Sequence, residues 1–427
     1  MKLWDKGFKT DEKIDIFTVG ADRELDLLLA KYDVIASRAH AQMLASTGLI
    51  TLKEGTLLTG ELDRIEKEID AGNFTIEDQF EDMHSKIEYL LIEELGDTGK
   101  KIHTARSRND QVLVAMQLYL REEINSMKAL TLDLFDILLN LAKTYQDVLM
   151  PGYTHLQVAM PSSFALWLGA YAESLADDML MLNTAHRICD QNPLGSAAGY
   201  GSSFPIDREF TTEALGFATM KYNVVAAQMG RGKVEKHTAY AMAGLAGTLG
   251  KLAMDICLYL SQNFDFISFP KEFTTGSSIM PHKKNPDVFE LIRGKCNKLQ
   301  ALPNTLAMLT TNLPSGYHRD LQLCKELIVP AIQEMKSCLE MTAFSIKEMK
   351  VNTNILEEEK YQYLFSVDTL NQMVLDGIPF REAYRQMGES IDKGTYTPHR
   401  DIHHTHTGSI GKPALQEIRN KMKRFSE

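Results

Sequence analysis

The sequence predicts an all-α protein: an elongated central bundle of long helices, with smaller helical domains at the N- and C-terminal ends. Three observations favour this fold class. No proline, the residue that interrupts helices, occurs before Pro151. Ten steps between apolar residues from Leu113 to Val148 cover 35 residues, a mean of about 3.5, which is the period of packed long helices. The same spacing returns between Met242 and Leu260.

Length and composition limit the domain organisation and the class of partner. A chain of 427 residues is too long for one ordinary compact core, so two or three domains, or one very elongated one, are expected. The predicted division is 1–105, 106–356 and 357–427. The net charge of −11 argues against nucleic acid or an anionic membrane as a partner. The five cysteines form no CxxC pair, and no stretch has the character of a signal peptide or a membrane span. These features predict a cytoplasmic protein.

The N-terminal domain is predicted to consist of amphipathic helices. Apolar periodicity indicates helices over 22–48, 56–71 and 78–94, with Gly48 and Gly72 as stops.

A polar cluster follows at 99–110. Ser107 with Asp110 three residues later predicts a capping box at a helix start. Arg106, Arg108 and Asn109 at the same helix N-terminus favour an anion site as well, by charge and by helix dipole.

The helix that starts there is predicted to run over 110–149, a length of about 60 Å at roughly 1.5 Å per residue. A helix of this length needs partners of comparable length, in a bundle and in an oligomer that covers the remaining apolar faces. Pro151 ends it, and His155 follows in a turn. Further helices are expected over 162–190 and through 242–260, with a glycine- and serine-rich loop at 193–205 between them.

The stretch 273–287 contains the densest group of polar side chains. Gly276, Pro281 and Pro286 exclude a helix, so a mobile loop is predicted, in which serine hydroxyls, lysines and Asn285 suit a carboxylate or an oxyanion. A phosphate-binding loop is excluded, because no second glycine precedes Lys283. A Ser/Lys hydrolase is excluded by the wrong spacing. A solvated basic loop is the simpler alternative.

The remaining chain is predicted to be helical. A helix over 288–302 precedes a connection at 310–320 that carries Tyr317, and Gln322 and Lys325 follow on the next helix. Shorter helices over 358–376, 379–393 and 413–425 indicate a small terminal domain. The histidine-rich segment 399–406 is interpreted as an exposed loop without a functional metal.

Three motifs together resemble one family. The loop Gly276–Asp287 resembles the signature loop of the fumarase/aspartase superfamily, and its doubled lysine before Asn-Pro-Asp is similar to that of the argininosuccinate lyases. The run from His103 to Asp110 is close to a signature of that family, and Thr154 to Gln157 matches its Thr-His-Leu-Gln motif. The resemblance extends over nearly the whole chain.

The resemblance implies a set of catalytic roles. Ser277 takes the place of the base that removes a carbon-bound proton, and Lys283 that of the cation that stabilises the dianionic intermediate. His155, oriented by Glu290, takes the place of the group that delivers a proton to the leaving amine.

It also implies substrate-binding positions. These are Arg108, Asn109, Thr154, Asn285, Tyr317, Gln322 and Lys325, beside which Ser278 offers a second loop hydroxyl. The expected substrate is the anion argininosuccinate, cleaved to arginine and fumarate without a cofactor or a metal. A homotetramer with sites shared between subunits is expected. Two alternatives stay open: a lyase acting on another N-succinyl amine such as adenylosuccinate, and a non-catalytic structural homologue.

Overall fold

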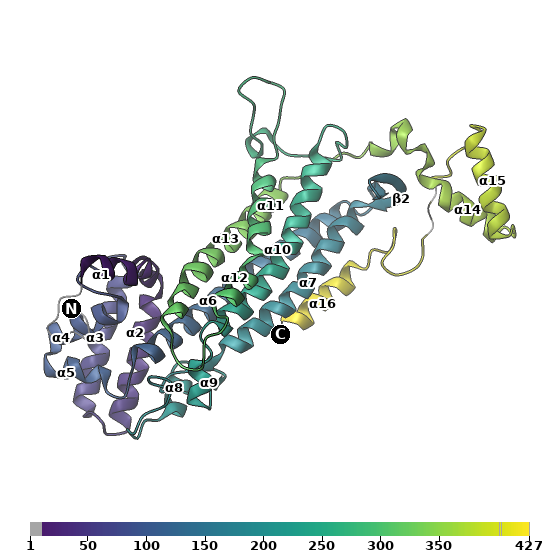
Figure 1. The fold of residues 1–427 in the computed structure, drawn as a ribbon. Helices are drawn as coiled ribbons and strands as arrows, with labels where there is room; N and C mark the ends of the chain where they lie inside the picture. Colours follow the sequence, from purple (N-terminus) through teal and green to yellow (C-terminus); the bar gives the residue numbers. More distant parts are fainter. Residues whose placement is uncertain (1–10, 401, 403, 427) are drawn as a thin grey trace. The chain divides into compact units, whose positions relative to one another are not determined.

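The computed structural model describes residues 11–400, 402 and 404–426, and over these residues the protein is all-α, as predicted (Figure 1). The strands within this part are short and form two-stranded sheets. The chain divides into two compact units. Unit 1 comprises Met1–Met127, Met181–Gly244 and Lys298–Met335, and unit 2 comprises Lys128–Leu180, Leu245–Asn297 and Lys336–Glu427. The three-domain division 1–105, 106–356 and 357–427 stays a prediction.

The N-terminal part of unit 1 is a group of helices that follow one another closely in sequence. They are α1 (Glu12–Val19), α2 (Asp22–Ser46), α3 (Leu52–Asp70), α4 (Met83–Leu95) and α5 (Asp97–Lys100), with a 3-10 turn at Lys101–His103. α2 and α3 lie side by side and pack against α4 (Figure 1). The predicted stops are confirmed, because Gly48 and Gly72 adopt φ values of 74° and 72°.

Two helix starts differ from the prediction because side chains cap them. α3 begins at Leu52, four residues before the predicted start, because Thr51 and Glu54 form a capping box. α4 begins five residues later than predicted, since Asp82 has extended backbone and its Oδ1 accepts a hydrogen bond from the Ser85 amide at 2.8 Å.

The long helix α6 (Arg108–Thr144) starts two residues before the predicted residue 110, directly after the predicted capping residue Ser107. The Ser107 amide donates to Asp110 Oδ1 at 3.0 Å, and Ser107 Oγ accepts from the Asn109 amide at 3.2 Å. Much of the predicted apolar seam is fully buried, namely Leu120, Ile124, Met127, Leu134 and Leu138. The helix ends five residues before the predicted residue 149.

A β-hairpin occupies the segment after α6, which was predicted only as a helix end and a turn. β1 (Leu149–Thr154) pairs with β2 (Gln157–Ser163) in antiparallel register, with Thr154 opposite Gln157. The two residues between the strands, His155 and Leu156, have φ values of 55° and 56°. This is the conformation of a tight hairpin turn, which holds His155 at the hairpin tip.

Unit 1 also contains short elements and the ends of long helices. They are β3 (Gln191–Asn192), α8 (Arg208–Ala214), β4 (Thr219–Met220), α9 (Val224–Gln228), α12 (Leu302–Leu309), η3 (Arg319–Gln322) and the starts of α10 (Lys233–Leu260) and α13 (Leu323–Ile346). The buried Asp110 of α6 fixes the predicted 193–205 loop, because its Oδ2 accepts from the amides of Gly195 and Ala197 at 3.1 and 2.9 Å.

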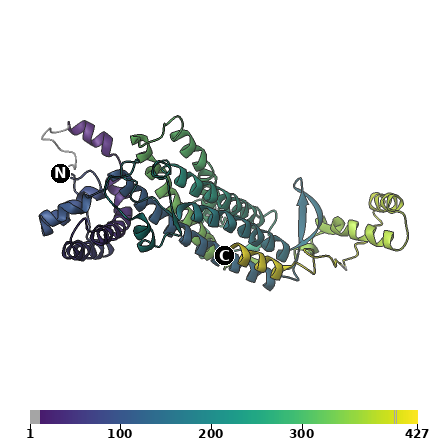
Figure 2. The same cartoon turned by 90° about the horizontal axis from the view of Figure 1, so that it is seen from below.

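Unit 2 is a bundle built on parts of α6, α7 (Phe164–Cys189), α10 and α13, together with α11 (Asp287–Leu299). Two acids join α7 to α10: Asp255 accepts from Trp167 Nε1 at 3.0 Å, and the buried Asp178 accepts from Thr248 Oγ1 at 2.6 Å. The C-terminal helix α16 (Leu415–Ser426) lies along this bundle (Figure 2), where Arg419 pairs with Asp136 of α6 at 2.5 Å.

α10 is apolar and long enough to cross a membrane, the one such helix among the described residues. Half of its most apolar window is buried inside the structure. All five cysteines are free thiols.

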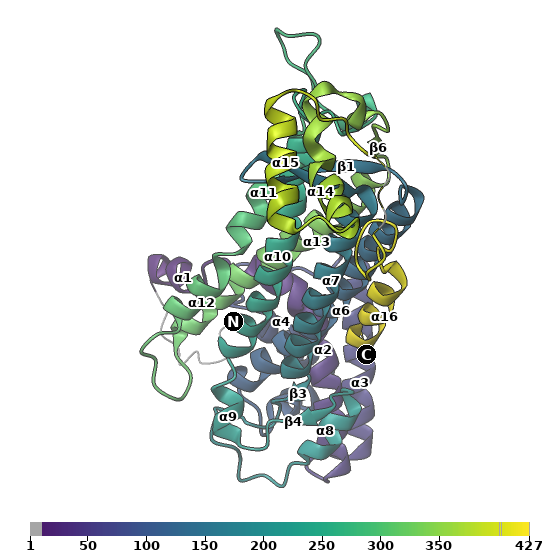
Figure 3. The ribbon, with the colours of Figure 1, turned by 90° about the vertical axis from the view of Figure 1, so that its right-hand side faces the viewer.

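The last part of unit 2 is a small helical substructure. It comes after β6 (Lys350–Val351), which pairs in antiparallel register with β5 (Ile267–Ser268). Its elements are the 3-10 segments Ile355–Glu357 and Glu359–Phe365, followed by α14 (Ser366–Leu375) and α15 (Phe380–Asp392). α14 and α15 lie side by side (Figure 3) around a core of Leu370, Ala383 and Met387. Within the predicted helix 358–376, the first half is therefore 3-10 rather than α. In the histidine-rich segment, His404 pairs with Asp368 at 2.8 Å, whereas Asp401 and His403 lie outside the described residues.

Candidate active site

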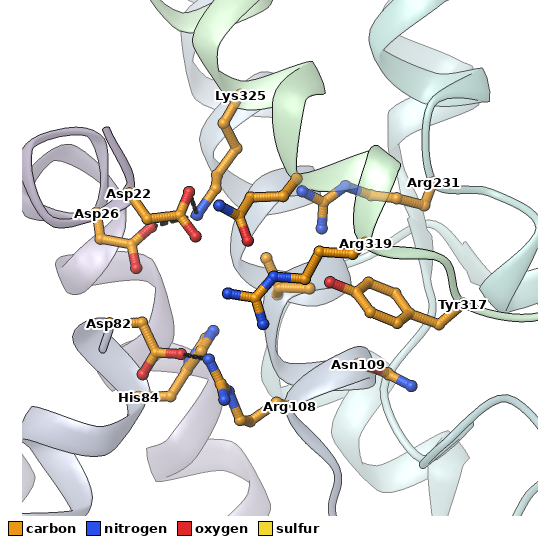
Figure 4. A pocket seen from close by; sticks show the side chains of 12 residues that line it. Asp22, Asp26, Asp82, His84, Arg108, Asn109, Arg231, Tyr317, Arg319 and Lys325 are labelled. Carbon is orange, nitrogen blue, oxygen red and sulfur yellow. Dashed lines mark hydrogen bonds and ion pairs between the residues drawn. The ribbon is translucent and has the colours of Figure 1, made fainter. Parts of the chain in front are cut away.

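A cavity of about 150 Å³ lies within unit 1, between α2, α4, the start of α6 and the segment η3–α13 (Figure 4). Five of the predicted substrate-binding residues line it: Arg108, Asn109, Tyr317, Gln322 and Lys325. Its wall has six further polar residues that were not among the predicted site residues: Asp22, Asp26, Asp82, His84, Arg231 and Arg319. The cavity is therefore lined by charges of both signs.

Lys325 is a buried cation held by two acids of α2. It is 3% exposed, and its Nζ lies 2.8 Å from Asp22 Oδ1 and 2.7 Å from Asp26 Oδ1 (Figure 4). Burial disfavours the charged ammonium, but the two carboxylates outweigh burial and raise the pKa of Lys325. Asp22 and Asp26 are four residues apart on α2, so they share one helix face. This spacing was the only signal in the sequence that could have indicated the pair.

Arg108 is held by the two acids that precede α4. Its Nη1 donates to Glu81 Oε2 at 3.0 Å, and its Nη2 contacts Asp82 Oδ2. Burial alone would raise the pKa of both carboxyl groups, but nearby cations lower it. For Asp82 these are His84 and Arg108, and for Glu81 they are Arg108 and Arg319.

His84 lines the cavity wall and also forms a buried ion pair. Its Nδ1 lies 3.0 Å from Asp33 Oδ1, and Asp33 outweighs the effect of burial and raises the pKa of His84. Arg106, which the sequence placed in an anion site, does not line the cavity. Its guanidinium is buried, donates to Ser37 Oγ at 2.8 Å and lies 3.7 Å from Asp33 Oδ1, so its role is structural.

The segment before α13 is tied to the end of α1. Gln322 Nε2 donates to the Thr18 carbonyl at 3.0 Å, and Arg319 Nη2 donates to the same carbonyl at 2.7 Å. Arg319 also donates to Glu81 Oε1 at 3.0 Å. Tyr317 is 36% exposed and lines the cavity wall without such an anchor. These contacts fix the cavity walls before any ligand is bound.

The predicted polar loop lies in unit 2, where it extends away from the helix ends before α11 (Figure 1). Its base is closed by pairing: Thr275 and Asn285 form an antiparallel bridge, with the Asn285 amide donating to the Thr275 carbonyl at 2.8 Å. Phe273 stacks on Phe344 of α13 with ring centroids 5.3 Å apart. Asn285 Nδ2 donates to the Gly276 carbonyl at 3.1 Å, so here its side chain stabilises the loop base.

Within the loop, Ser277 Oγ accepts hydrogen bonds from the backbone amides of Ile279 and Met280, at 3.4 and 3.2 Å. Two N–H donors aimed at one hydroxyl oxygen stabilise negative charge on that oxygen. Ser278 and Lys283 are exposed, and neither side chain pairs with another residue in the part of the chain that the structure describes.

The remaining predicted residues also lie in unit 2, apart from one another in the chain. Thr154 and His155 are exposed at the tip of the β1–β2 hairpin, and Glu290 is exposed in the first turn of α11. Within the described chain, His155 and Glu290 make no hydrogen bond or ion pair with each other. One chain therefore presents three groups of predicted site residues: the unit 1 cavity, the loop and the hairpin tip.

Comparison with known proteins defines the class of this protein. A family model described as a lyase matches residues 6–301. Over the full chain, solved structures of similar fold include EDDS lyase in complex with formate and the class II fumarase from Schistosoma mansoni. The TM-scores are 0.78 and 0.73, at 20% and 16% sequence identity. The alignments cover 98% and 96% of this chain, and 90% and 94% of those chains. The fold is thus that of the fumarase/aspartase superfamily.

Closer relatives define the branch. The chain is 56% identical to the argininosuccinate lyases of Parabacteroides distasonis and Phocaeicola vulgatus over 99% of its length, and covers 95% of each relative. It is 55% identical to that of Bacteroides fragilis, with 100% of the chain and 95% of the relative covered. The chain belongs to the argininosuccinate lyase family.

Proposed function

We propose that the protein is a cytoplasmic carbon–nitrogen lyase that converts argininosuccinate to arginine and fumarate. The observation that carries this function is the 56% identity to curated argininosuccinate lyases over 99% of the chain. The chain also retains each residue to which the family resemblance assigns catalysis: Ser277, His155, Lys283 and Glu290.

The reaction is a β-elimination. A base removes a proton from carbon, the adjacent carboxylate takes up the developing negative charge, and the carbon–nitrogen bond then breaks with proton delivery to the leaving nitrogen. We assign the first step to Ser277, and its two backbone N–H donors support the assignment because they favour the deprotonated oxygen. The unpaired Lys283 then stabilises the dianionic intermediate, with Asn285 and Ser278 beside it.

His155 is assigned to proton delivery, oriented by Glu290. Since the two residues are exposed and form no hydrogen bond or ion pair with each other in the described part of the chain, we propose that they meet between subunits of a homotetramer. Thr154 at the same hairpin tip binds substrate. The loop, the hairpin tip and the unit 1 cavity then combine from different subunits into one site.

The unit 1 cavity supports argininosuccinate over other succinyl amines. Argininosuccinate carries carboxylates as well as a guanidinium and an ammonium group, so its site needs both charges. Arg108 and Lys325 supply cations, and Asp22, Asp26 and Asp82 supply anions. Asn109, Tyr317 and Gln322 add neutral donors and acceptors. Adenylosuccinate would instead bring a phosphate and a purine, to which three carboxylates offer no favourable contact.

The experiment that tests this function is direct. Purified protein mixed with argininosuccinate is expected to release fumarate, followed by its ultraviolet absorbance, without any added cofactor. Adenylosuccinate and aspartate serve as controls and should give no fumarate. Fumarate from adenylosuccinate but not from argininosuccinate would establish the alternative lyase, and a pure tetramer inert toward all three would favour the structural homologue.

A further inference from the structure

A second cavity in unit 1, of about 400 Å³, lies between the α9–α10 junction and the loop that precedes η3. Its basic wall residues are Lys233, Lys236 and His237 of α10, together with Arg231. The opposite wall is the segment 313–316, which adds the hydroxyl of Ser315. None of these residues except Arg231 belongs to the cavity assigned to argininosuccinate.

Of the basic residues of this second cavity, Arg231 is paired with a carboxylate, whereas Lys233 and Lys236 lack such partners among the described residues. Lys233 and Lys236 form no ion pair within the described chain, and the neighbouring acid, Glu235, is buried against Arg231 with Oε1 3.1 Å from Nε. Burial and then the charges of Lys233, Lys236 and Lys221 lower the pKa of His237. Burial and Lys233 likewise lower the pKa of Lys221. The cluster therefore carries uncompensated positive charge.

A buried amide in the same wall supplies an independent indication of a ligand. Gln228 is 1% exposed and lines the cavity, yet neither its Nε2 nor its Oε1 has a hydrogen-bond partner among the described residues. An unsatisfied buried amide costs about 1–3 kcal/mol, so such a group usually has a partner in the functional state. The Nε2 donor beside unpaired lysines indicates a partner with several acceptor oxygens, and the Oε1 acceptor calls for a hydrogen-bond donor such as a hydroxyl on the same partner.

We propose that this cavity is a second, non-catalytic site that binds a phosphorylated small molecule through Lys233, Lys236 and Gln228. The choice of phosphate over carboxylate follows from the donors. Carboxylates are best matched by a free planar guanidinium, but Arg231 is already engaged by Glu235 and by the Leu321 carbonyl at 3.2 Å. The lysines offer point charges that suit the several oxygens of a tetrahedral phosphate. The volume exceeds that of orthophosphate alone and admits an attached organic group.

The site can be tested by calorimetric titration of the full-length protein with inorganic phosphate, pyrophosphate and malonate. Binding read in this way needs no turnover, so the result is independent of the proposed lyase function. We expect saturable binding of phosphate and tighter binding of pyrophosphate, both weakened by added salt. Malonate should bind more weakly than either.

Two variants locate the binding. The double variant Lys233→Gln/Lys236→Gln should weaken pyrophosphate binding roughly 100-fold, because two charge-assisted hydrogen bonds are lost. Gln228→Leu should weaken it about tenfold. The control Lys251→Gln/Lys412→Gln removes the same charge from exposed lysines elsewhere and should bind like the wild type. No saturable binding, equal losses in the control, or malonate binding as tightly as pyrophosphate would each overturn the proposal.

Discussion

The unit 1 cavity and the polar loop 273–287 both contain charged side chains, but these charges are arranged in opposite ways. In the cavity, Lys325 and Arg108 are each held by two carboxylates, and a buried histidine is held by a fifth acid, Asp33. In the loop, the side chains of Lys283 and Ser278 are exposed and unpaired in the described chain, and a bridge closes the base. The cavity is thus built before substrate arrives, whereas the loop has few contacts that oppose its movement onto a substrate.

The largest effect is expected in the loop. Ser277→Ala should lower kcat by about 10³-fold or more, because it removes the oxygen to which we assign proton abstraction. Substrate binding by calorimetry should change little, since the cavity is intact. Ser278→Ala is the matched control and should lose much less activity. A Ser277→Ala enzyme that keeps most of its kcat would show that the base lies elsewhere.

In the cavity, the expected effect is on stability. Lys325→Met leaves Asp22 and Asp26 buried without their counterion and should lower the free energy of unfolding by about 3–5 kcal/mol, measured by urea denaturation. Lys393→Met removes an exposed lysine paired with Glu389, and should leave the free energy of unfolding within experimental error. Equal effects of the two changes would contradict the contrast between a buried and an exposed ion pair.

A smaller, pH-dependent effect is expected from His84. Its pKa is raised in the folded state, so its contribution to stability is full below the unfolded value of 6.5 and is lost as pH rises through the folded pKa. The pKa of His40 is lowered, so its folded form is neutral and its unfolded form loses its remaining proton by about pH 7.5, above which His40 adds no slope. The free energy of unfolding should therefore fall with rising pH above about 7.5, by at most about 1.4 kcal/mol per unit. His84→Gln should flatten this dependence, and an unchanged slope in that variant would contradict the assignment.

The smallest effect is a difference in local opening. Trypsin should cleave first at Lys283 or Lys284 in the loop, because exposed, weakly tied backbone opens most readily. Arg108 and Lys325 should resist until global unfolding. Fumarate should slow the loop cleavage if the loop closes over it. Mass spectrometry of the early fragments distinguishes these outcomes, and first cleavage beside Arg108 would reverse the comparison.

The same two regions show what the sequence can predict. The loop could be predicted because its prolines, glycine and lysines lie within one short segment of the sequence. The helices could be predicted because the spacing of their apolar residues is visible over neighbouring turns. The acids of the cavity were missed because their partners are remote in the chain: Asp26 and Lys325 are 299 residues apart. No local pattern encodes such a contact.

The β1–β2 hairpin was missed for a different reason. Its turn residues, His155 and Leu156, have positive φ without the Asn-Gly or Asp-Gly signal that usually marks such turns. Pro151 and Pro161, which lie opposite each other in the strands, also argued against strand structure. Here the tertiary context overrides local preference.

The central claim is that the cavity of one chain acts with the loop of another, and mixing two inactive variants tests it most directly. Asn109→Ala removes a cavity side chain that hydrogen-bonds to no other described residue, so the fold should be spared, and Ser277→Ala disables the loop. Each should be nearly inactive alone. After the two are unfolded and refolded together, about a quarter of sites would combine an intact cavity with an intact loop, so about a quarter of wild-type fumarate release should return. A refolded tetrameric mixture that stays inactive would contradict the account.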